Sequence, residues 1–255
     1  MSGQVTRRVR LIGIGAGDPD QLTLEAIAAM RSVAYFVVAD KGADDPLLAA
    51  REALLVRHVG DGAQVIAVRD PERDRSPSDY DKAVTDWHTA RAEVYEQALI
   101  DNPGDAGFLV WGDPAFYDST IRIVEKVLAR GNVEFEWDVI PGISSLQLLA
   151  ARHRIVLHGI GEPFTVTTGR RLAEAIDAGH DNLVVMLNAR FEAQDLLESG
   201  QAGDWDIWWG INLGTKDEVL VAGRLSEVTE RIVAARSEAK AAAGWIMDIY
   251  LLKRR

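Results

Sequence analysis

Apolar residues along the chain alternate between two patterns, which predict two kinds of element. Short runs rich in β-branched and aromatic residues predict strands, and longer stretches with apolar residues at helical spacing predict helices. Strands are expected over residues 9–14, 34–39, 64–68, 108–111 and 135–140. Helices are expected between them, over residues 22–33, 46–57, 80–99 and 119–130. This alternation is typical of βα units on a mainly parallel sheet.

The second part of the chain continues the alternation. A helix is expected over residues 144–152, followed by a connector over residues 154–163. Further strands are expected over residues 164–168, 183–187, 207–213, 219–222 and 245–252. Ser226 is expected to cap the helix before the last strand. We therefore predict two α/β domains, an N-terminal domain over residues 1–153 and a C-terminal domain over residues 154–255.

Composition and charge narrow the class of protein. With 47% hydrophobic and 26% charged residues in 255, the chain is neither disordered nor fibrous. Its net charge of −11 argues against nucleic acid as a partner, because nucleic-acid binding depends on neutralising phosphates. The absence of cysteine excludes disulfides, thiol nucleophiles, zinc-thiolate sites and iron-sulfur clusters.

The sequence also carries no signal for a membrane or a metal. Its apolar runs are far shorter than the roughly 18 to 20 residues that span a bilayer, and the first ten residues are too polar for a signal peptide. We expect a cytoplasmic protein that does not bind membranes. The five histidines include no pair at i, i+4, so no metal site is expected.

A glycine-rich loop follows the first predicted strand and reads Gly13-Ile-Gly-Ala-Gly-Asp-Pro19. Glycines let a backbone turn sharply and approach a ligand closely. Asp40 closes the second predicted strand, where dinucleotide-binding proteins have a ribose-binding carboxylate, so a NAD-dependent oxidoreductase is one interpretation. Two other interpretations of this loop are an ordinary Rossmann-type methyltransferase and a purely structural turn. The G-x-G-x-G spacing, and an aspartate that would repel a pyrophosphate, count against dinucleotide binding.

Two more loops have a similar composition. Gly112-Asp-Pro-Ala-Phe-Tyr117 and Ile140-Pro-Gly-Ile-Ser-Ser145 each follow a predicted strand and precede a predicted helix. Open α/β sheets bind ligands at the carboxyl ends of their strands. We therefore expect all three loops to gather at one edge of a sheet, around a single ligand.

In these loops the chain resembles the tetrapyrrole methylases of the cobalamin, siroheme and diphthine pathways. The stretch from Gly13 to Thr23 is similar to the family pattern G-x-G-x-G-D-P-x-x-L-T, and the other two loops are similar to G-D-P-x-x-[YF] and V-P-G-[IV]-[ST]-[SA]. The resemblance covers nearly the whole chain. It implies the fold of the class III methyltransferases, with two α/β domains and an active site in the cleft between them. It also implies S-adenosylmethionine as methyl donor and S-adenosylhomocysteine as product.

The resemblance further implies particular ligand contacts, position by position. Leu187 falls where the family often has methionine, and Leu213 falls at a backbone position on the adenine side. The first loop would contact the tetrapyrrole through Gly15 and Asp18. The other implied cofactor contacts lie in the second and third loops and are Gly112, Asp113, Pro114, Phe116, Tyr117, Ser144 and Ser145.

Outside the loops the chain resembles one branch of the family. The segment from Asp70 to Arg75 and the later Trp87-His-x-x-Arg91 are similar to the deacetylating branch, which methylates C-1 of the corrin precursor precorrin-5 and releases acetate. Residues 39–42 read Ala-Asp-Lys-Gly instead of the tyrosine-rich stretch of many relatives, and Ala16 replaces a common proline. Another corrin-ring methylase and a non-catalytic tetrapyrrole carrier remain the alternatives.

Acetate release needs a base, whereas methyl transfer from a sulfonium needs little acid-base help. His88 is the first candidate because histidine titrates near neutrality, and Asp40 is the second. The alternative for His88 is a hydrogen bond at a helix surface, and the alternative for Asp40 is a helix cap or loop carboxylate. His88, Arg91 and Tyr95 have the i, i+3, i+7 spacing of one helix face.

The many carboxylates of a corrin precursor call for local positive charge in an acidic protein. Candidates for this role, with solvated surface charge as the alternative, are Arg69, Arg73, Arg75, Arg91, Arg170 and Arg171. The tryptophan cluster of residues 205–209 suits a strand core or a dimer contact better than stacking on a tetrapyrrole. Apolar edges of this kind favour a homodimer.

Overall fold

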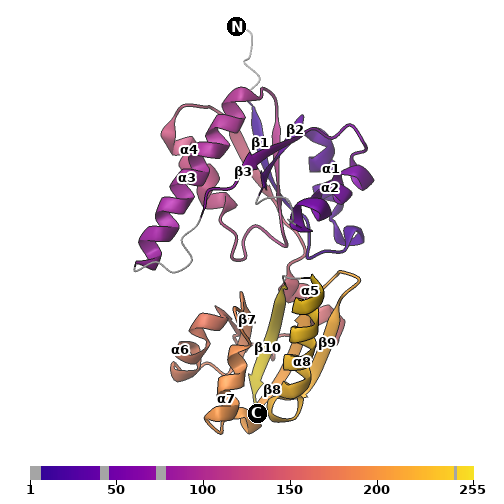
Figure 1. Cartoon of the computed structure of the whole chain (residues 1–255), viewed down its shortest axis with the longest axis vertical. Coiled ribbons are helices and arrows are strands. Elements are labelled where there is room, and N and C mark those ends of the chain that lie inside the picture. Colours follow the sequence, from indigo (N-terminus) through magenta and orange to yellow (C-terminus); the bar gives the residue numbers. More distant parts are fainter. Residues whose placement is uncertain (1–6, 41–45, 73–78, 244–245) are drawn as a thin grey trace. The chain divides into compact units, whose positions relative to one another are not determined.

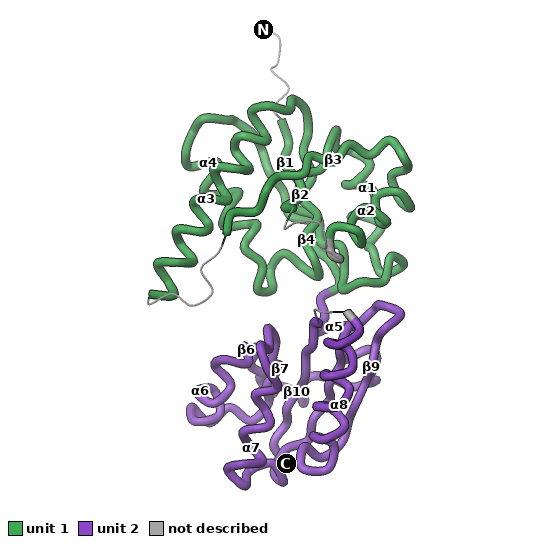
Figure 2. Tube along the Cα trace, in the orientation of Figure 1, with its two compact units in different colours: residues 1–143 green, residues 144–255 purple. Residues whose placement is uncertain are grey.

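The computed structural model describes residues 7–40, 46–72, 79–243 and 246–255. Contacts within the chain divide it into two units, residues 1–143 and residues 144–255 (Figure 2). The sequence predicted a division after residue 153. The contacts instead place helix α5 (Ser145–His153) with the second unit, because it packs on three strands of that unit.

Unit 1 is built on a parallel five-stranded sheet in the order β3-β2-β4-β1-β5 (Figure 1). Its strands are β1 (Arg8–Gly13), β2 (Tyr35–Asp40), β3 (Val65–Arg69), β4 (Ala106–Val110) and β5 (Glu136–Ile140). Every pairing between them is parallel. The sequence predicted these strands to within about two residues. Strand β4 is buried along its whole length, as expected for a central strand covered on both faces.

Two pairs of helices cover the two faces of this sheet. Figure 1 shows α1 and α2 on one side and α3 and α4 on the other. Their bounds are α1 (Leu24–Ser32), α2 (Pro46–His58), α3 (Tyr80–Asp101) and α4 (Thr120–Arg130), with a short 3-10 helix η1 (Pro19–Gln21) before α1. Tyr95 of α3 packs with Leu11 and Phe108 in one core, and Met30 of α1 packs with Ile12 in the other. Unit 1 is therefore a doubly wound α/β fold.

Unit 2 has a mixed sheet in the order β6-β7-β10-β8-β9. Its strands are β6 (Thr165–Thr168), β7 (Asn182–Met186), β8 (Trp205–Ile211), β9 (Val219–Arg224) and β10 (Asp248–Arg254). Only β6 and β7 pair in parallel, so the expectation of a mainly parallel sheet is correct for unit 1 and wrong for unit 2. A short turn joins β8 to β9, and a turn of that kind can only join antiparallel strands.

The helices of unit 2 pack beside this sheet and complete its core. Besides α5 they are α6 (Leu172–Asp177), α7 (Asp195–Glu198), α8 (Leu225–Ala243) and three 3-10 turns, η2 (Gly169–Arg171), η3 (Glu192–Gln194) and η4 (Ala202–Asp204). Helix α8 begins at Leu225, so Ser226 lies inside it, and the prediction that Ser226 is a cap was wrong. Trp205 and Trp209 are fully buried in this core, as the sequence favoured. None of the described helices is long and apolar enough to cross a bilayer.

Candidate functional site

Three loops of unit 1 come together at the carboxyl edge of its sheet. They follow β1, β4 and β5, and the strand order places the first loop between the other two. Gly15 and Gly112 form a β-bridge, in which the Gly112 amide donates to the Gly15 carbonyl at 2.7 Å and the Gly15 amide donates to the Gly112 carbonyl at 3.2 Å. The expectation that these loops gather at one edge of a sheet is therefore confirmed.

Glycine is required where the three loops touch. A Cβ atom on Gly13 would lie 2.5 Å from the Gly142 nitrogen, and a Cβ on Gly142 would lie 2.8 Å from the Gly13 carbonyl carbon. At Gly112 the reason is different, because its φ is +70° and no heavy atom lies within 4 Å of the Cβ position. The space beside the α-carbon of Gly112 is thus open, although the residue itself is buried.

Asp113, a predicted cofactor contact, makes hydrogen bonds within the loops. Its Oδ2 accepts from the Gly142 amide at 2.9 Å, and its Oδ1 accepts from the Ala115 amide at 2.8 Å. The carboxylate therefore ties the second loop to the third. Its role in the structure is to shape the loops.

Further along the second loop, side chains turn outward. Pro114 is buried, whereas Phe116 and Tyr117 are exposed. Tyr117 has a φ of +51°, in the left-handed region that a bulky residue rarely adopts. Such strain costs about 1–3 kcal/mol and is concentrated at functional sites. The conformation of Tyr117 therefore favours a ligand site at this loop.

Ser144, also a predicted cofactor contact, is buried and caps helix α5. Its Oγ accepts from the Gln147 amide at 3.3 Å, while Gln147 Oε1 accepts from the Ser144 amide at 2.9 Å. This reciprocal capping box occupies the hydroxyl within the protein. Ser145 is the first residue of α5 and is half-buried.

In the first loop, Asp18 has a similar local role. Its Oδ1 accepts from the Asp20 amide at 2.9 Å and so caps η1. Gly15 contributes its backbone to the bridge with Gly112. The predicted tetrapyrrole contacts at Gly15 and Asp18 thus lie at the sheet edge, with Asp18 engaged in the start of a turn.

Arg91 is turned toward Asp70 and not toward solvent. From helix α3 its Nε donates to Asp70 Oδ1 at 2.6 Å and its Nη2 donates to Asp70 Oδ2 at 2.8 Å. The side chains are only 12% and 9% exposed. The Asp70 amide in turn donates to the carbonyl of Asp40 at 2.9 Å. This geometry counts against Arg91 as a binder of substrate carboxylates, because its planar fork is already paired.

Aromatic rings and a second carboxylate surround this ion pair. The guanidinium carbon of Arg91 lies 4.4 Å from the ring centroid of Trp87, whose Nε1 donates to the Pro71 carbonyl at 3.1 Å. Burial lowers the pKa of Arg91, but Tyr95, Asp70 and Asp118 together raise it above its ordinary value. Asp118 is the residue directly after the second loop. The ion pair therefore lies within the electrostatic reach of that loop.

The two candidate bases lie on different elements of unit 1. His88 is half-buried on α3, with its ring centroid 5.4 Å from that of Trp87. Asp40 is the last residue of β2 and is also half-buried. Arg69 ends β3 and is exposed. Arg73 and Arg75 lie outside the described residues.

In unit 2, two predicted cofactor contacts follow strands at one edge of the sheet. Leu187 follows β7, has a φ of +55° and is 62% exposed. Leu213 follows β8 and is 4% exposed, and a Cβ on Gly210 would lie 2.7 Å from its Cδ2. Strand β10 lies between β7 and β8 and is antiparallel to both, so both turns lie near its first residue, Asp248.

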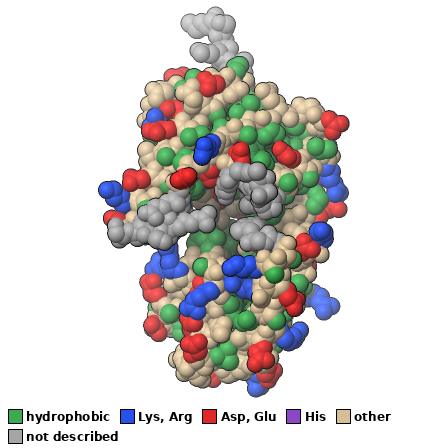
Figure 3. Space-filling view, in the orientation of Figure 1, with side chains coloured by type: hydrophobic (Ala, Val, Ile, Leu, Met, Phe, Trp, Pro, Cys, Tyr) green, Lys and Arg blue, Asp and Glu red, His purple; other side chains and the backbone are tan. Residues whose placement is uncertain are grey.

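Positive charge is present on unit 2. Figure 3 shows Lys and Arg side chains grouped on part of its visible face, among more scattered acidic ones. Arg170 and Arg171 are both exposed, and Arg171 forms an ion pair with Glu174 at 2.6 Å. Within the part of the chain that the structure describes, no three His, Asp or Glu side chains are grouped so as to hold a metal ion.

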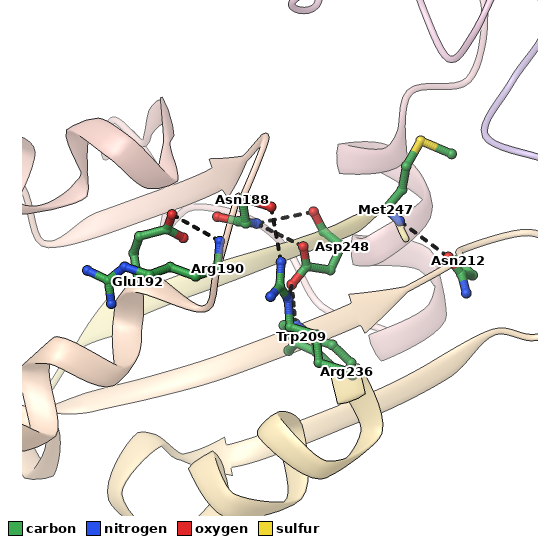
Figure 4. A network of polar contacts seen from close by, with 8 residues as sticks. All are labelled: Asn188, Arg190, Glu192, Trp209, Asn212, Arg236, Met247 and Asp248. Carbon is green, nitrogen blue, oxygen red and sulfur yellow. Dashed lines mark hydrogen bonds and ion pairs between the residues drawn. The ribbon is translucent and has the colours of Figure 1, made fainter. Parts of the chain in front are cut away.

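The sequence analysis missed a buried polar network at the same edge of unit 2. Figure 4 shows Asp248, Arg236, Trp209 and Asn188 joined by hydrogen bonds. The available signal was a single carboxylate directly before the apolar run of residues 249–252, since buried charges are rare unless paired.

The comparisons with known proteins agree with this fold. The model of the Tetrapyrrole (Corrin/Porphyrin) Methylases matches residues 8–229. The chain belongs to this family. Over 253 residues it is 44% identical to the precorrin-6A synthase (deacetylating) of Sinorhizobium sp. This match covers 97% of this chain and 95% of the relative.

Solved structures are similar over almost the full length. A cobalamin synthesis related protein, CobF, of Corynebacterium diphtheriae matches with a TM-score of 0.82 and 35% identity, over 98% of this chain and 99% of that one. Uroporphyrin-III C-methyltransferase of Thermus thermophilus, complexed with S-adenosyl homocysteine, matches with a TM-score of 0.59 and 22% identity, over 96% and 92%. The second likeness shows the fold alone.

Proposed function

We propose that the protein is an S-adenosylmethionine-dependent C-methyltransferase of cobalamin biosynthesis. It methylates precorrin-5 at C-1 and releases acetate to give precorrin-6A. The observation that carries this proposal is that three glycine loops meet at one sheet edge in a chain that is 44% identical to a precorrin-6A synthase over nearly its whole length. A tetrapyrrole precursor is the substrate, and S-adenosylhomocysteine is the second product.

The described residues fit this cofactor. Space is open at the Cβ position of Gly112, and the exposed Phe116 and Tyr117 offer aromatic surface in the same loop. The exposed Leu187 and the backbone of Leu213 are assigned to the adenine side. Asp113 acts indirectly, by holding the second and third loops together, and Ser144 caps α5, because their oxygens already have partners within the protein.

S-adenosylmethionine supplies an electrophilic methyl group, and a neutral thioether leaves. The residues of this chain therefore have to orient the acceptor carbon and exclude water, and both lower the barrier of such a displacement. Acetate release differs, because water must add to the acetyl carbonyl. The bond from that carbon to the ring then breaks, and its electron pair stays with the ring. We propose that His88 is the base that accepts a proton from that water, with Asp40 as the alternative base.

One incubation tests the activity. The purified protein is given precorrin-5 and S-adenosylmethionine with a labelled methyl group, and both label transfer and free acetate are measured. Transfer with acetate is expected. Transfer without acetate would leave a corrin-ring methylase and remove the deacetylating branch. A bound corrinoid with neither product would favour a carrier.

A titration separates this proposal from the oxidoreductase alternative. S-adenosylhomocysteine is expected to bind with a micromolar Kd or tighter, and NAD(H) is expected not to bind. The opposite result would favour a nucleotide-dependent oxidoreductase that uses the Gly13 loop and Asp40.

A homodimer in the cytoplasm, without nucleic-acid or membrane partners, stays a prediction from the sequence. Sedimentation equilibrium of the purified chain tests the dimer. A mass of one chain, 28.0 kDa, at every concentration would contradict it.

A further inference from the structure

The buried network in unit 2 is centred on Asp248, whose role the proposed reaction leaves open. The Asp248 side chain is 2% exposed. Its Oδ2 accepts from Arg236 Nε at 2.9 Å and from Trp209 Nε1 at 3.0 Å. These bonds connect α8 and β8 to the first residue of β10 (Figure 4).

The same network holds the turn that follows β7. Asn188 Nδ2 donates to the Asp248 carbonyl at 3.2 Å, and Arg236 Nη2 donates to the Asn188 carbonyl at 3.0 Å. One guanidinium therefore bonds to the Asp248 carboxylate and to the backbone of Asn188. Asn188 is held by its side chain and its main chain at once, directly beside Leu187.

The residue before Asp248 holds the turn that follows β8. The Asn212 amide donates to the Met247 carbonyl at 2.8 Å, and the Met247 amide donates to Asn212 Oδ1 at 3.3 Å. Both turns that carry the proposed adenine-side residues are thus anchored at the start of one strand.

Both turns contain a residue in the left-handed region. Leu187 has a φ of +55° and Asn212 a φ of +50°. Asparagine tolerates this conformation, whereas leucine seldom adopts it. Leu187 is also largely exposed, so packing of its side chain does not stabilise the conformation. The bonds to Asn188 must therefore hold it, as strain persists only where its surroundings determine it.

We propose that Asp248 and Arg236 are positioning residues, which fix the Leu187 turn beside the Leu213 turn that Met247 holds, and so set the affinity for the nucleoside part of the cofactor. The inference rests on the proposed function, which assigns these two turns to the adenine side. Neither Asp248 nor Arg236 is itself assigned a contact with the cofactor.

The test uses Arg236→Lys in the full-length protein. Lysine keeps a positive charge beside Asp248, but a single ammonium lacks the fork that bonds to both Asp248 and Asn188. Calorimetric titration is expected to show a Kd for S-adenosylhomocysteine about tenfold higher than that of the wild type. Amide exchange over residues 187–190 is expected to become faster without ligand.

Arg130→Lys in unit 1 is the matched control. Arg130 also bridges two groups, since it bonds to Glu96, which is 8% exposed, and to Glu93. This variant is expected to keep the wild-type Kd, whatever its loss of thermal stability. Equal weakening of binding in both variants, or a wild-type Kd in Arg236→Lys, would overturn the proposal.

A second variant covers the case in which Arg236→Lys does not fold. Asn188→Ala removes the amide bond to Asp248 and leaves Arg236 and Trp209 in place on the carboxylate. It is expected to raise the Kd severalfold, and an unchanged Kd would contradict the positioning role. If the wild type itself does not bind S-adenosylhomocysteine, the proposed function fails. If the wild type binds S-adenosylhomocysteine and the variants bind it with the same Kd, the positioning role fails and the proposed function stands.

Discussion

Single residues of unit 1 decide whether the three loops can touch. Gly13 and Gly142 approach so closely that neither has room for a side chain, and Asp113 links the second loop to the third through the Gly142 amide. These contacts join residues far apart in the chain. The shape of the candidate site therefore depends on a few atoms of backbone.

Gly142→Ala is expected to destabilise unit 1 by roughly 1–3 kcal/mol, because the added methyl group is forced against the Gly13 backbone. It is also expected to weaken binding of S-adenosylhomocysteine, since the loops must separate. Thermal denaturation and calorimetry measure the two effects. Gly62→Ala is the control, because nothing lies within 4 Å of its Cβ position. Equal behaviour of the two variants would show that the loop contact is unimportant.

His88→Ala tests the assignment of the base. Acetate release is expected to slow by roughly 10²-fold or more, the usual contribution of a general base, while the Kd for S-adenosylhomocysteine stays unchanged. Single-turnover measurement of acetate gives the rate. His158→Ala, at an exposed position of unit 2, is the comparison. Wild-type acetate kinetics in His88→Ala would assign the role elsewhere, with Asp40 the next residue to change.

At the scale of elements, the ends of helices and strands carry the candidate chemistry. Helix α5 begins at the capping box of Ser144 and Gln147, directly after the third loop. The sequence indicated a hydroxyl pair at this helix start, but whether Ser144 faces a ligand or its own helix depends on its rotamer. The structure shows the hydroxyl used by the helix.

Ser144→Ala is therefore expected to act as a cap deletion. It should cost about 1 kcal/mol of stability and change the Kd for S-adenosylhomocysteine little. Thr23→Ala, which removes the Oγ1 cap of α1, is expected to cost a similar amount. Chemical denaturation and calorimetry test both variants. A large loss of affinity in Ser144→Ala alone would restore the direct contact that the family resemblance implied.

At the scale of the whole molecule, the protonation state of one histidine links the stability of unit 2 to pH. In unit 2, His153 Nε2 lies 3.0 Å from the Trp209 carbonyl, which can only accept, so the neutral ring donates here. Burial lowers the pKa of His153 below its ordinary value of 6.5. The unfolded chain therefore binds this proton more readily than the folded one.

The free energy of unfolding of unit 2 is therefore expected to fall when the pH is lowered. The contribution of His153 is fully present above pH 6.5 and is lost as the pH falls through its lower folded pKa. His153→Gln keeps a donor for the Trp209 carbonyl and is expected to flatten this pH dependence. Urea denaturation between about pH 5 and 8 compares the two proteins. Identical pH profiles would exclude His153 as the titrating group.

The sequence by itself determined the order of strands and helices, the parallel sheet of unit 1, the three loops and the family. The elements, the parallel sheet and the loops follow from apolar periodicity and glycine chemistry, which are properties of short segments, and the family follows from the resemblance of the loop motifs. The sequence could not determine how the strands of unit 2 are arranged side by side in their sheet. The place of β10 between β7 and β8 depends on pairing between strands that are distant in the chain.

Only the tertiary structure decided which polar side chains are already engaged. Asp18, Asp113, Ser144 and Arg91 were expected to meet ligands, yet each has a partner within the protein. Asp248 drew no attention in the sequence, yet it bonds to Arg236 of α8 and to the turn that follows β7. The physical reason is that a hydrogen bond depends on which donor lies within about 3 Å of which acceptor, and folding brings together residues that are distant in the chain.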